Sequence, residues 1–508
     1  MSMSLATDWC ERWAQYSPKK LFLREHSTGL EWTYSDFNNR AEAFAQYLAK
    51  DLGLKKGDRI GVYSKNRAEF ILLYVACVKM GTILVPLNFR LTPRELDTLI
   101  GDAGPSLFLY EACFSEEVKR LNTLETIPVK AEVESIRRFL SDDIGTVIPG
   151  QKEAIPFDHT VMILYTAGTT GLSKGVMITH RQIFWNAINT VLRLNLTEND
   201  HTQSYAPFFH TGGWNVLFTP FLFVGGSHTI LNSFDSDLIL ELMEKEKTTL
   251  LFGVPTMLQM MSDSPKFATT DLSSVRFAIV GGAPMPIPLI NIWHEKGIAI
   301  RQGFGLTEVG PNCFSLHQDD AIRKKGSIGF PNFYIEAKIV DENGNELPAN
   351  TPGELWLKSP VVTEGYWRKP KETAEAITGG WFHTGDILIK DEEGYFFVVD
   401  RKKNMYISGG ENVYPSEIEK YLYANPAVKE CAVIGVADER WGETGKAFVV
   451  LNPGQPLTGD EILNYCREGL AKYKIPKSVV LLDSLPKNEA GKINRQELVR
   501  IHNQQSTH

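Results

Sequence analysis

Apolar and polar residues fall into alternating blocks in the first half of the chain. Residues 59–64 form a strand-like run, residues 67–80 are almost continuously apolar, and residues 83–87 are strand-like again. Gly81 directly follows the long apolar run, at the place where glycine commonly ends a helix. This strand–helix–strand order predicts a largely parallel sheet with helical crossovers.

Two helix starts are indicated by the residues that precede an apolar repeat. Thr92, Pro93 and Glu95 form a capping box with proline at the first helical position, which predicts a helix from residue 93. A second helix is predicted between Ser35 as N-cap and Gly53 as its end, because apolar residues recur there at near-helical spacing. These residues are Phe37, Ala41, Phe44 and Leu48.

The second half of the chain is richer in short strands and turns. Turn sequences at residues 341–344 and 391–394 divide the stretch 329–400, which predicts a β-rich subdomain. After Asp400, a helix start at Ser416 and strand-like runs predict a small α+β unit. The predicted fold class is therefore α/β, with a β-rich part and a small α+β part toward the C-terminus.

Length and composition predict a folded protein of at least two domains. The chain has 508 residues, 43% hydrophobic and 22% charged, whereas a single core stops growing near about 250–300 residues. This composition excludes general disorder. The net charge of −8 argues against nucleic acid as the main partner, because nucleic-acid binding requires a basic surface.

Cysteine and targeting patterns indicate a reducing compartment. The six cysteines form no CxxC pair, so they predict neither a disulfide scaffold nor a zinc site. The longest clean apolar run, residues 70–78, is about half of what a membrane span requires, and the N-terminus lacks a signal-peptide pattern. We expect a cytoplasmic protein; peripheral membrane contact and a homodimer stay open.

A loop rich in glycine and threonine follows the strand-like residues 161–165. Its glycines let backbone N–H groups approach a phosphate, its hydroxyls donate hydrogen bonds, and Lys174 supplies positive charge. It differs from the P-loop, because Lys174 follows Gly171 by three residues. Taken alone, it also fits a flexible turn with a solvated lysine. The predicted phosphate contacts are Thr166, Gly168, Thr169, Thr170, Gly171 and Lys174.

This loop resembles the signature loop of the adenylate-forming superfamily, which includes acyl-CoA synthetases, luciferases and peptide-synthetase adenylation domains. Four further segments match that family in the same order. One of them, residues 302–308, resembles its aromatic-Gly-x-Thr-Glu motif. The resemblance implies that Phe304 stacks on adenine, Thr307 contacts phosphate and Glu308 binds Mg²⁺. Further nucleotide contacts implied by the family are Gly282, Ala283, Pro284, Gly303 and Gly305.

The remaining motifs lie toward the C-terminus. The resemblance implies that Asp386 and Arg401 bind the ribose hydroxyls, a role that suits a carboxylate acceptor. It makes Asp400 the hinge between a large domain, residues 1–400, and a small mobile domain, residues 401–508. Lys492 is implied as the catalytic lysine, stabilising charge that develops between the substrate carboxylate and the α-phosphate. The implied CoA-facing residues are Gly409, Gly410 and Trp441.

The acid pocket of the family corresponds to residues 205–215, an aromatic and apolar segment. Phe209, Gly212 and Trp214 are predicted to line it, and His210 to lie near the reacting carboxylate. The same aromatics are also typical of a large core. Trp214 resembles the gate tryptophan of long-chain acyl-CoA synthetases, and the segment lacks the aspartate with which amino-acid-activating domains pair the substrate ammonium.

The predicted activity is ATP-dependent conversion of a medium- or long-chain fatty acid to acyl-adenylate and then acyl-CoA, with ATP, Mg²⁺ and CoA as cofactors. An aryl-acid or o-succinylbenzoate ligase, a carrier-protein acceptor and a non-catalytic binding homologue stay open. Only 508 − 492 = 16 residues follow Lys492, so we expect free CoA as the acceptor. The chain departs from the family pattern at four positions: Ala167, Ser173, Phe304 and Asn404.

Overall fold

The structure, a computed structural model, divides into two compact units. Unit 1 comprises Met1–Ala337 and Leu357–Phe382, and unit 2 comprises Lys338–Trp356 and His383–His508. The predicted boundary at residue 400 stays a prediction. The residues that the structure describes are 7–141, 144, 147, 150, 154–166, 173–283, 285–408, 410–487 and 492–505.

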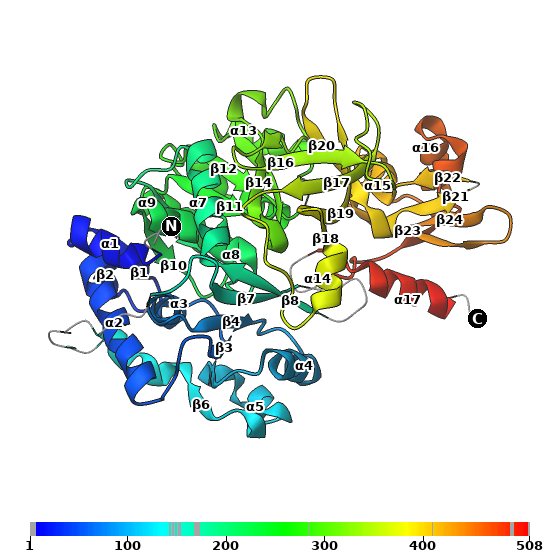
Figure 1. Cartoon of the computed structure of the whole chain (residues 1–508). Coiled ribbons are helices and arrows are strands. Elements are labelled where there is room, and N and C mark those ends of the chain that lie inside the picture. Colours follow the sequence, from blue (N-terminus) through cyan, green and yellow to red (C-terminus); the bar gives the residue numbers. More distant parts are fainter. Residues whose placement is uncertain are drawn as a thin grey trace. The chain divides into compact units, whose positions relative to one another are not determined.

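The first sheet of unit 1 has the strand order β6–β5–β3–β4–β7–β8 (Figure 1). β3 to β6 are parallel, β7 pairs in parallel with β4, and β8 returns antiparallel to β7. This arrangement confirms the predicted α/β class. The strands are β3 (Arg59–Tyr63), β4 (Ile83–Leu87), β5 (Leu107–Tyr110), β6 (Val129–Glu132), β7 (Thr160–Thr166) and β8 (Lys174–Thr179).

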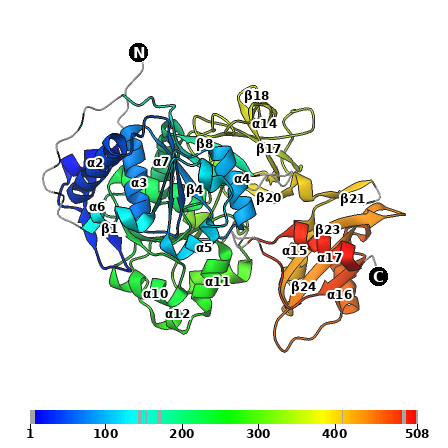
Figure 2. The same ribbon diagram turned by 90° about the horizontal axis from the view of Figure 1, so that it is seen from below.

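Helices cover both faces of this sheet. Figure 2 shows α3 (Ala68–Met80) and α4 (Pro93–Ala103) on opposite sides of β4. Because successive residues of a strand point to opposite faces, Leu84 packs in the core on the α3 side and Val85 in the core on the α4 side. Coverage of both faces is what a parallel sheet requires.

Two further sheets lie within unit 1, in the orders β2–β1–β10–β9 and β11–β12–β13–β14–β15. β11, β12 and β13 are parallel, so their carboxyl ends meet at one edge, where ligands of α/β proteins commonly bind. The strands are β1 (Leu21–Glu25), β2 (Glu31–Thr33), β9 (His201–Ser204), β10 (Ser227–Ile230), β11 (Leu250–Gly253), β12 (Phe277–Val280), β13 (Ile300–Leu306), β14 (Gly310–Ser315) and β15 (Phe330–Pro331).

The N-terminal end of α2 (Tyr34–Lys50) differs from the prediction. Thr33, not Ser35, is the N-cap, because its hydroxyl accepts the N–H of Asp36 while the Asp36 carboxylate accepts the N–H of Thr33. The helix ends at Lys50 with Asp51 as its C-cap, before Gly53. The other helices of unit 1 are α1 (Trp9–Tyr16), α5 (Ser115–Val118), α6 (Arg138–Ser141), α7 (His180–Leu194), α8 (Thr211–Asn215), α9 (Phe218–Val224), α10 (Ser236–Lys245), α11 (Pro255–Asp263), α12 (Pro265–Thr269), α13 (Ile287–Glu295) and α14 (Pro370–Ala376).

The C-terminal part of the chain contains two more sheets. One has the order β16–β17–β19–β18 with β20 paired to β19, and the other has the order β22–β21–β24–β23 with β25 paired to β24. The strands are β16 (Glu336–Val340), β17 (Gly353–Lys358), β18 (Ile377–Thr378), β19 (Trp381–Lys390), β20 (Phe396–Arg401), β21 (Tyr406–Ser408), β22 (Glu411–Val413), β23 (Val428–Asp438), β24 (Gly442–Leu451) and β25 (Ser478–Leu481).

The α-helices in the described part of unit 2 are α15 (Pro415–Tyr423), α16 (Gly459–Gly469) and α17 (Arg495–Gln505). Ile418 of α15 and Ile462 of α16 share one core with Val449 of β24, which gives this unit the predicted α+β character. Among the described residues, no helix is both long enough and apolar enough to cross a membrane.

Candidate functional site

Two paired strand ends flank the predicted phosphate loop. Thr166 is the last residue of β7, Lys174 is the first residue of β8, and the two are partners in the antiparallel register. The Thr166 hydroxyl donates to the Lys174 carbonyl oxygen at 3.4 Å. Four predicted phosphate contacts lie outside the described residues, namely Gly168, Thr169, Thr170 and Gly171. The strand pairing fixes where the loop leaves and re-enters the sheet.

A tyrosine that the motifs do not predict lies beside both Lys174 and Glu308. Tyr366 is 8% exposed, its hydroxyl donates to Oε1 of Glu308 at 3.0 Å, and Nζ of Lys174 lies 4.8 Å from its ring centroid. Burial raises the pKa of the Tyr366 phenol well above its usual value, and the charge of Glu308 raises it further. The phenol therefore stays a hydrogen-bond donor at neutral pH.

Thr307 and Glu308 lie in a short 3₁₀ turn, η4 (Thr307–Val309), directly after β13. Nε2 of Gln182, a buried residue of α7, donates to the Thr307 carbonyl oxygen at 2.9 Å. The backbone N–H of Thr363 donates to the Glu308 carbonyl oxygen at 2.7 Å. The turn is thus held by two segments that are far apart in the sequence.

The chemistry of this turn suits Mg²⁺ bound together with phosphate. Glu308 offers a carboxylate and Thr307 a hydroxyl, both of them hard oxygen ligands. Within the described parts of the chain, no cluster of three His, Cys, Asp or Glu side chains could hold a metal ion by itself. Mg²⁺ is usually bound by one or two carboxylates plus substrate phosphates and water, so the residues present fit it.

The predicted adenine contacts lie at the carboxyl ends of β12 and β13. Phe304 is half-buried, and its ring meets that of Phe314 edge-on at 5.8 Å. A Cβ at Gly305 would lie 2.3 Å from the Gly310 carbonyl oxygen, so close backbone packing requires glycine there. A Cβ at Gly303 would meet nothing closer than 3.5 Å.

The loop after β12 approaches the same strand end. Gly282, with φ 79°, and Ala283 follow the strand closely. A Cβ at Gly281 would lie 3.6 Å from the Gly303 carbonyl oxygen, which shows how near the two backbones are. Pro284 lies outside the described residues.

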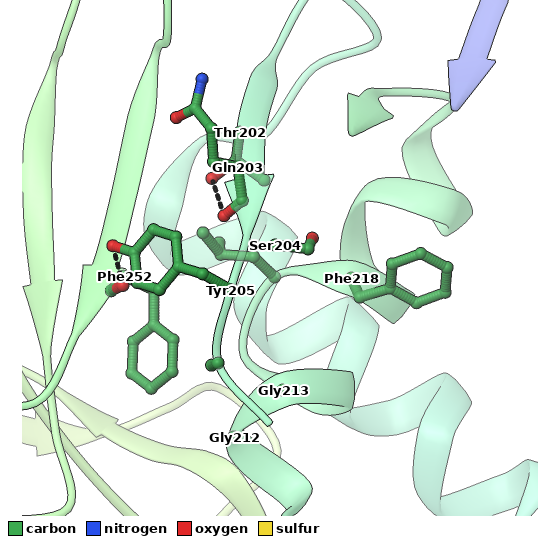
Figure 3. A pocket seen from close by; sticks show the side chains of 10 residues that line it. Thr202, Gln203, Ser204, Tyr205, Gly212, Gly213, Phe218 and Phe252 are labelled. Atoms are coloured by element: carbon green, nitrogen blue, oxygen red, sulfur yellow. Dashed lines mark hydrogen bonds between the residues drawn. The ribbon is translucent and has the colours of Figure 1, made fainter. Parts of the chain in front are cut away.

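A small cavity lies beside the predicted acid-pocket segment (Figure 3). Tyr205 and Phe252 lie next to each other on one side of it, and the Tyr205 hydroxyl donates to the Phe252 carbonyl oxygen at 2.6 Å. A Cβ at Gly212 would lie 3.4 Å from the Phe252 ring, so this glycine and the ring face each other. The lining residues are Thr202, Gln203, Ser204, Tyr205, Ala206, Gly212, Gly213, Leu217, Phe218 and Phe252.

Trp214 packs as a core residue. It is 0% exposed, stacks on Phe208 at a centroid distance of 4.3 Å, and its Nε1 donates to the Phe208 carbonyl oxygen. The rings of Tyr74 and Phe70 lie 5.0 and 5.7 Å away. Trp214 does not line the cavity, and its role as a gate stays a prediction.

Phe209 and His210 lie together just before α8. The Phe209 ring is 4% exposed and lies 4.5 Å from the His210 ring and 5.2 Å from the Phe89 ring. The His210 carbonyl oxygen accepts the N–H of Gly213 at 3.1 Å. Phe209 does not line the cavity, so of the predicted pocket residues only Gly212 does so in the described structure.

The candidate residues of unit 2 gather around one buried carboxylate. Asp386, 2% exposed, is the register partner of Arg401, whose Nε lies 2.7 Å from Oδ1 of Asp386. The surrounding protein desolvates the Lys492 ammonium and lowers its pKa; Arg401 lowers that pKa further, whereas Asp386 opposes the shift. The pKa of Lys403 is lowered by the same causes. Three cations therefore share one anion, which favours binding of further negative charge.

Asp400 accepts four hydrogen bonds inside unit 2. Its Oδ1 accepts the N–H of Arg401 at 2.6 Å and Nδ2 of Asn404 at 2.9 Å. Its Oδ2 accepts the N–H and the hydroxyl of Ser416 at 3.0 and 3.1 Å. Asn404, one of the departures from the family pattern, thus donates a bond that an aspartate carboxylate could not donate.

Two of the predicted CoA-facing residues, Gly410 and Trp441, lie in turns of unit 2. Gly410, between β21 and β22, has φ 86°, a conformation that favours glycine. Trp441 is 40% exposed, and the guanidinium carbon of Arg440 lies 5.0 Å from its ring centroid. Gly409 lies outside the described residues.

Sequence motifs do not indicate Gln182 and Tyr366, which contact the predicted site, or Lys403, whose charge interacts with Arg401 and Asp386. In the sequence, Gln182 looks like an ordinary polar residue of a helix, and Lys403 looks like one charge of a basic run. Tyr366 reaches Glu308 only because its segment bridges to β8, through Val176. The tyrosine between a glycine and a tryptophan was the one local feature that could have drawn attention to it.

Comparison with known proteins finds relatives over nearly the whole chain. The AMP-binding enzyme family matches residues 10–367, and the AMP-binding enzyme C-terminal domain matches residues 417–492. A feruloyl-CoA synthase of Amycolatopsis sp is 38% identical over 97% of this chain and 98% of its own length. The long-chain-fatty-acid–CoA ligase FadD13 of Mycobacterium tuberculosis is 34% identical over 94% of this chain and 95% of its own length.

A solved structure is similar along its full length as well. The o-succinylbenzoate CoA synthetase MenE of Bacillus subtilis, in complex with its acyl-adenylate intermediate, superimposes with a TM-score of 0.85. It is 30% identical, and the match covers 97% of each chain.

Proposed function

The chain belongs to the family of AMP-binding enzymes and is an acyl-CoA ligase, and from this premise we propose that its acid is a compact aromatic carboxylic acid. The activity has two steps. A carboxylate oxygen attacks the α-phosphorus of ATP, and pyrophosphate leaves. The CoA thiolate then attacks the acyl carbon of the acyl-adenylate, and AMP leaves.

The cavity beside Gly212 carries the choice of acid. It is small and bounded by bulky side chains, which favours a compact acid over a long alkyl chain. The side chains of Tyr205, Phe218 and Phe252 supply flat apolar walls. The feruloyl-CoA synthase among the relatives supports the same class of substrate.

The predicted site residues divide the work of the first step. We propose that Thr166 and Lys174 bind phosphate oxygens, that Phe304 stacks on adenine, and that Asp386 and Arg401 bind the ribose. Glu308 and Thr307 would hold Mg²⁺, which supplies positive charge to the phosphates when bound. Lys492 stabilises the charge that develops as the carboxylate attacks, and His210 lies near the carboxylate. The proposed CoA contacts are Gly409, Gly410 and Trp441.

A fatty acid is the second candidate substrate. The apolar lining of the cavity also suits an alkyl chain, and the 34% identity to a long-chain-fatty-acid–CoA ligase favours it. An o-succinylbenzoate-type acid belongs to the aromatic class that we propose first.

A panel of acids tests the proposal. Pyrophosphate release and CoA thioester formation are measured with benzoic, 3-phenylpropenoic, octanoic and hexadecanoic acids. We expect kcat/KM for at least one aromatic acid to exceed that for hexadecanoic acid at least about tenfold, or about 1.4 kcal/mol. A preference for hexadecanoic acid would overturn the aromatic assignment.

A methyl group added at Gly212 sharpens the same test. Gly212→Ala places a Cβ 3.4 Å from the Phe252 ring, so kcat/KM for the aromatic acid should fall about tenfold while the KM for ATP stays the same. Gly101→Ala is the matched control, because a Cβ there meets nothing nearer than 3.8 Å. Equal effects of the two substitutions would show that the cavity does not receive the acid.

A further inference from the structure

The segment that carries Tyr366 runs alongside the strand that begins at Lys174. Tyr366 forms an antiparallel bridge with Val176, and the N–H of Trp367 donates to the Gly175 carbonyl oxygen at 2.7 Å. In the other direction, the N–H of Met177 donates to the carbonyl oxygen of Gly365 at 3.1 Å. The backbone of Tyr366 is therefore fixed against β8.

Thr373 also fixes the backbone of this tyrosine. The N–H of Tyr366 donates to Oγ1 of Thr373 at 2.9 Å, and the Thr373 hydroxyl donates to the Lys369 carbonyl oxygen at 2.8 Å. Gly365 has φ 139°, and a Cβ there would lie 2.4 Å from Thr373. Hydrogen bonds to β8 and to Thr373 therefore hold the backbone of Tyr366 in place.

Two opposite charges contact different parts of this ring. The Lys174 ammonium lies 4.8 Å from the ring centroid, where the negative face of an aromatic ring attracts a cation. The Glu308 carboxylate accepts from the hydroxyl at the other end of the ring. Both charged side chains therefore contact the same tyrosine.

We propose that Tyr366 is a positioning residue of the adenylation step, which holds the Lys174 ammonium at its ring and the Glu308 carboxylate at its hydroxyl and aims each at the bound nucleotide. This inference rests on the proposed roles of Lys174 and Glu308, but not on the identity of the acid. The hydroxyl orients Glu308 for the metal ion, and the ring face orients Lys174 for phosphate. Groups that orient a metal ligand commonly affect metal affinity about 10–100-fold.

Tyr366→Phe separates these two contributions, because it keeps the ring and removes only the hydroxyl. Calorimetric titration of ATP at a series of Mg²⁺ concentrations, without any acid, measures how ATP binding depends on Mg²⁺. We expect the Mg²⁺ concentration for half-maximal ATP binding to rise about tenfold, while ATP binding without Mg²⁺ is unchanged. Tyr366→Leu also removes the ring face, so it should weaken ATP binding without Mg²⁺ as well.

Tyr34→Phe is the matched control for loss of a buried phenol hydrogen bond. The Tyr34 hydroxyl donates to the Gly226 carbonyl oxygen at 2.7 Å, and the side chain is fully buried in another part of unit 1. This variant should lower Tm about as much as Tyr366→Phe but leave the Mg²⁺ dependence of ATP binding unchanged. Equal Mg²⁺ dependence in Tyr366→Phe and the unsubstituted protein would overturn the proposal.

The titration is independent of the acid panel. If no aromatic acid is activated but Tyr366→Phe shifts the Mg²⁺ dependence, the positioning role stands and the substrate proposal falls. If an aromatic acid is activated but the Mg²⁺ dependence is unchanged, the substrate proposal stands and the positioning role falls.

Discussion

The two units hold their candidate residues in opposite ways. In unit 1, Lys174 and Glu308 are half-buried, and a neutral phenol contacts both of them. In unit 2, the cations of Arg401 and Lys492 lie near the buried carboxylate of Asp386. Neutral buried partners restrict where a side chain can point, whereas charges also act over distance. We infer that unit 1 supplies fixed geometry and unit 2 supplies charge.

The largest effect should come from removing the central charge of unit 2. Lys492→Ala should lower the adenylation rate about 100- to 1,000-fold, because it removes the cation that stabilises developing charge. Thioester formation from supplied acyl-adenylate should stay nearly unchanged. Pyrophosphate release and thioester formation are measured separately. Lys487→Ala, which breaks an ion pair with Glu430, is the control. An equal loss of adenylation and thioester formation in Lys492→Ala would contradict a role of Lys492 in the first step alone.

Removal of a core aromatic tests the rigidity of unit 1. Trp214→Ala should lower the free energy of unfolding of this unit by about 3–5 kcal/mol, as expected for a fully buried tryptophan. Trp441→Ala is the control, because Trp441 is exposed and its loss should lower the free energy of unfolding by less than about 0.5 kcal/mol. Denaturant titration of the two variants and the unsubstituted protein measures both changes. Little destabilisation, with a change in acyl-chain preference, would instead support the predicted gate.

A change from amide to carboxylate tests the hydrogen bonds around Asp400. Asn404→Asp replaces a donor 2.9 Å from Oδ1 of Asp400 with a second carboxylate, so unit 2 should lose about 1–3 kcal/mol of stability at neutral pH. The loss should shrink as pH falls and the introduced carboxyl group binds a proton. Asn404→Ala removes the bond without adding charge. Thermal unfolding at several pH values should show a pH-dependent difference only for the aspartate variant.

The smallest effect concerns the pH profile of adenylation. The pKa of Lys492 is lowered by desolvation and then by Arg401, and the lysine must be protonated to stabilise negative charge. The adenylation rate should therefore fall at a lower pH than for an ordinary lysine. Arg401→Gln removes the repelling cation, so it should raise the pKa of Lys492 and move the alkaline limb to higher pH. An unchanged limb would show that another group limits the rate.

Local sequence patterns predicted much of the fold. The capping box at Thr92 correctly predicted the start of α4, and Gly81 correctly predicted the end of α3. The N-cap of α2 was predicted at Ser35, because this serine is nearer the apolar repeat. The helix begins earlier because Thr33 and Asp36 form two reciprocal hydrogen bonds. The strands β23 and β24 extend beyond the strand-like runs 431–436 and 447–451 that the sequence shows, since their pairing also includes polar residues.

The candidate site was predictable only where residues are close in sequence or fall in known motifs. Asp386 and Arg401 belong to different motifs, and the structure pairs them through neighbouring strands. Tyr366 was missed because strand pairing alone brings it to Glu308. Trp214 was predicted at a channel, but local sequence does not distinguish a channel wall from a core packed on Phe208. The adenylate-forming resemblance itself is confirmed by the family matches.

Each unit is assembled from two stretches of chain, and this sets an order of events during synthesis. The ribosome releases Lys338–Trp356, the first stretch of unit 2, before Leu357–Phe382, the last stretch of unit 1. Until the latter emerges, Tyr366 cannot bridge to Val176 on β8, the last strand of its sheet. An exposed strand edge is a template for incorrect pairing. The nascent chain is thus most vulnerable to misassembly while unit 2 has already begun to appear and unit 1 is still incomplete.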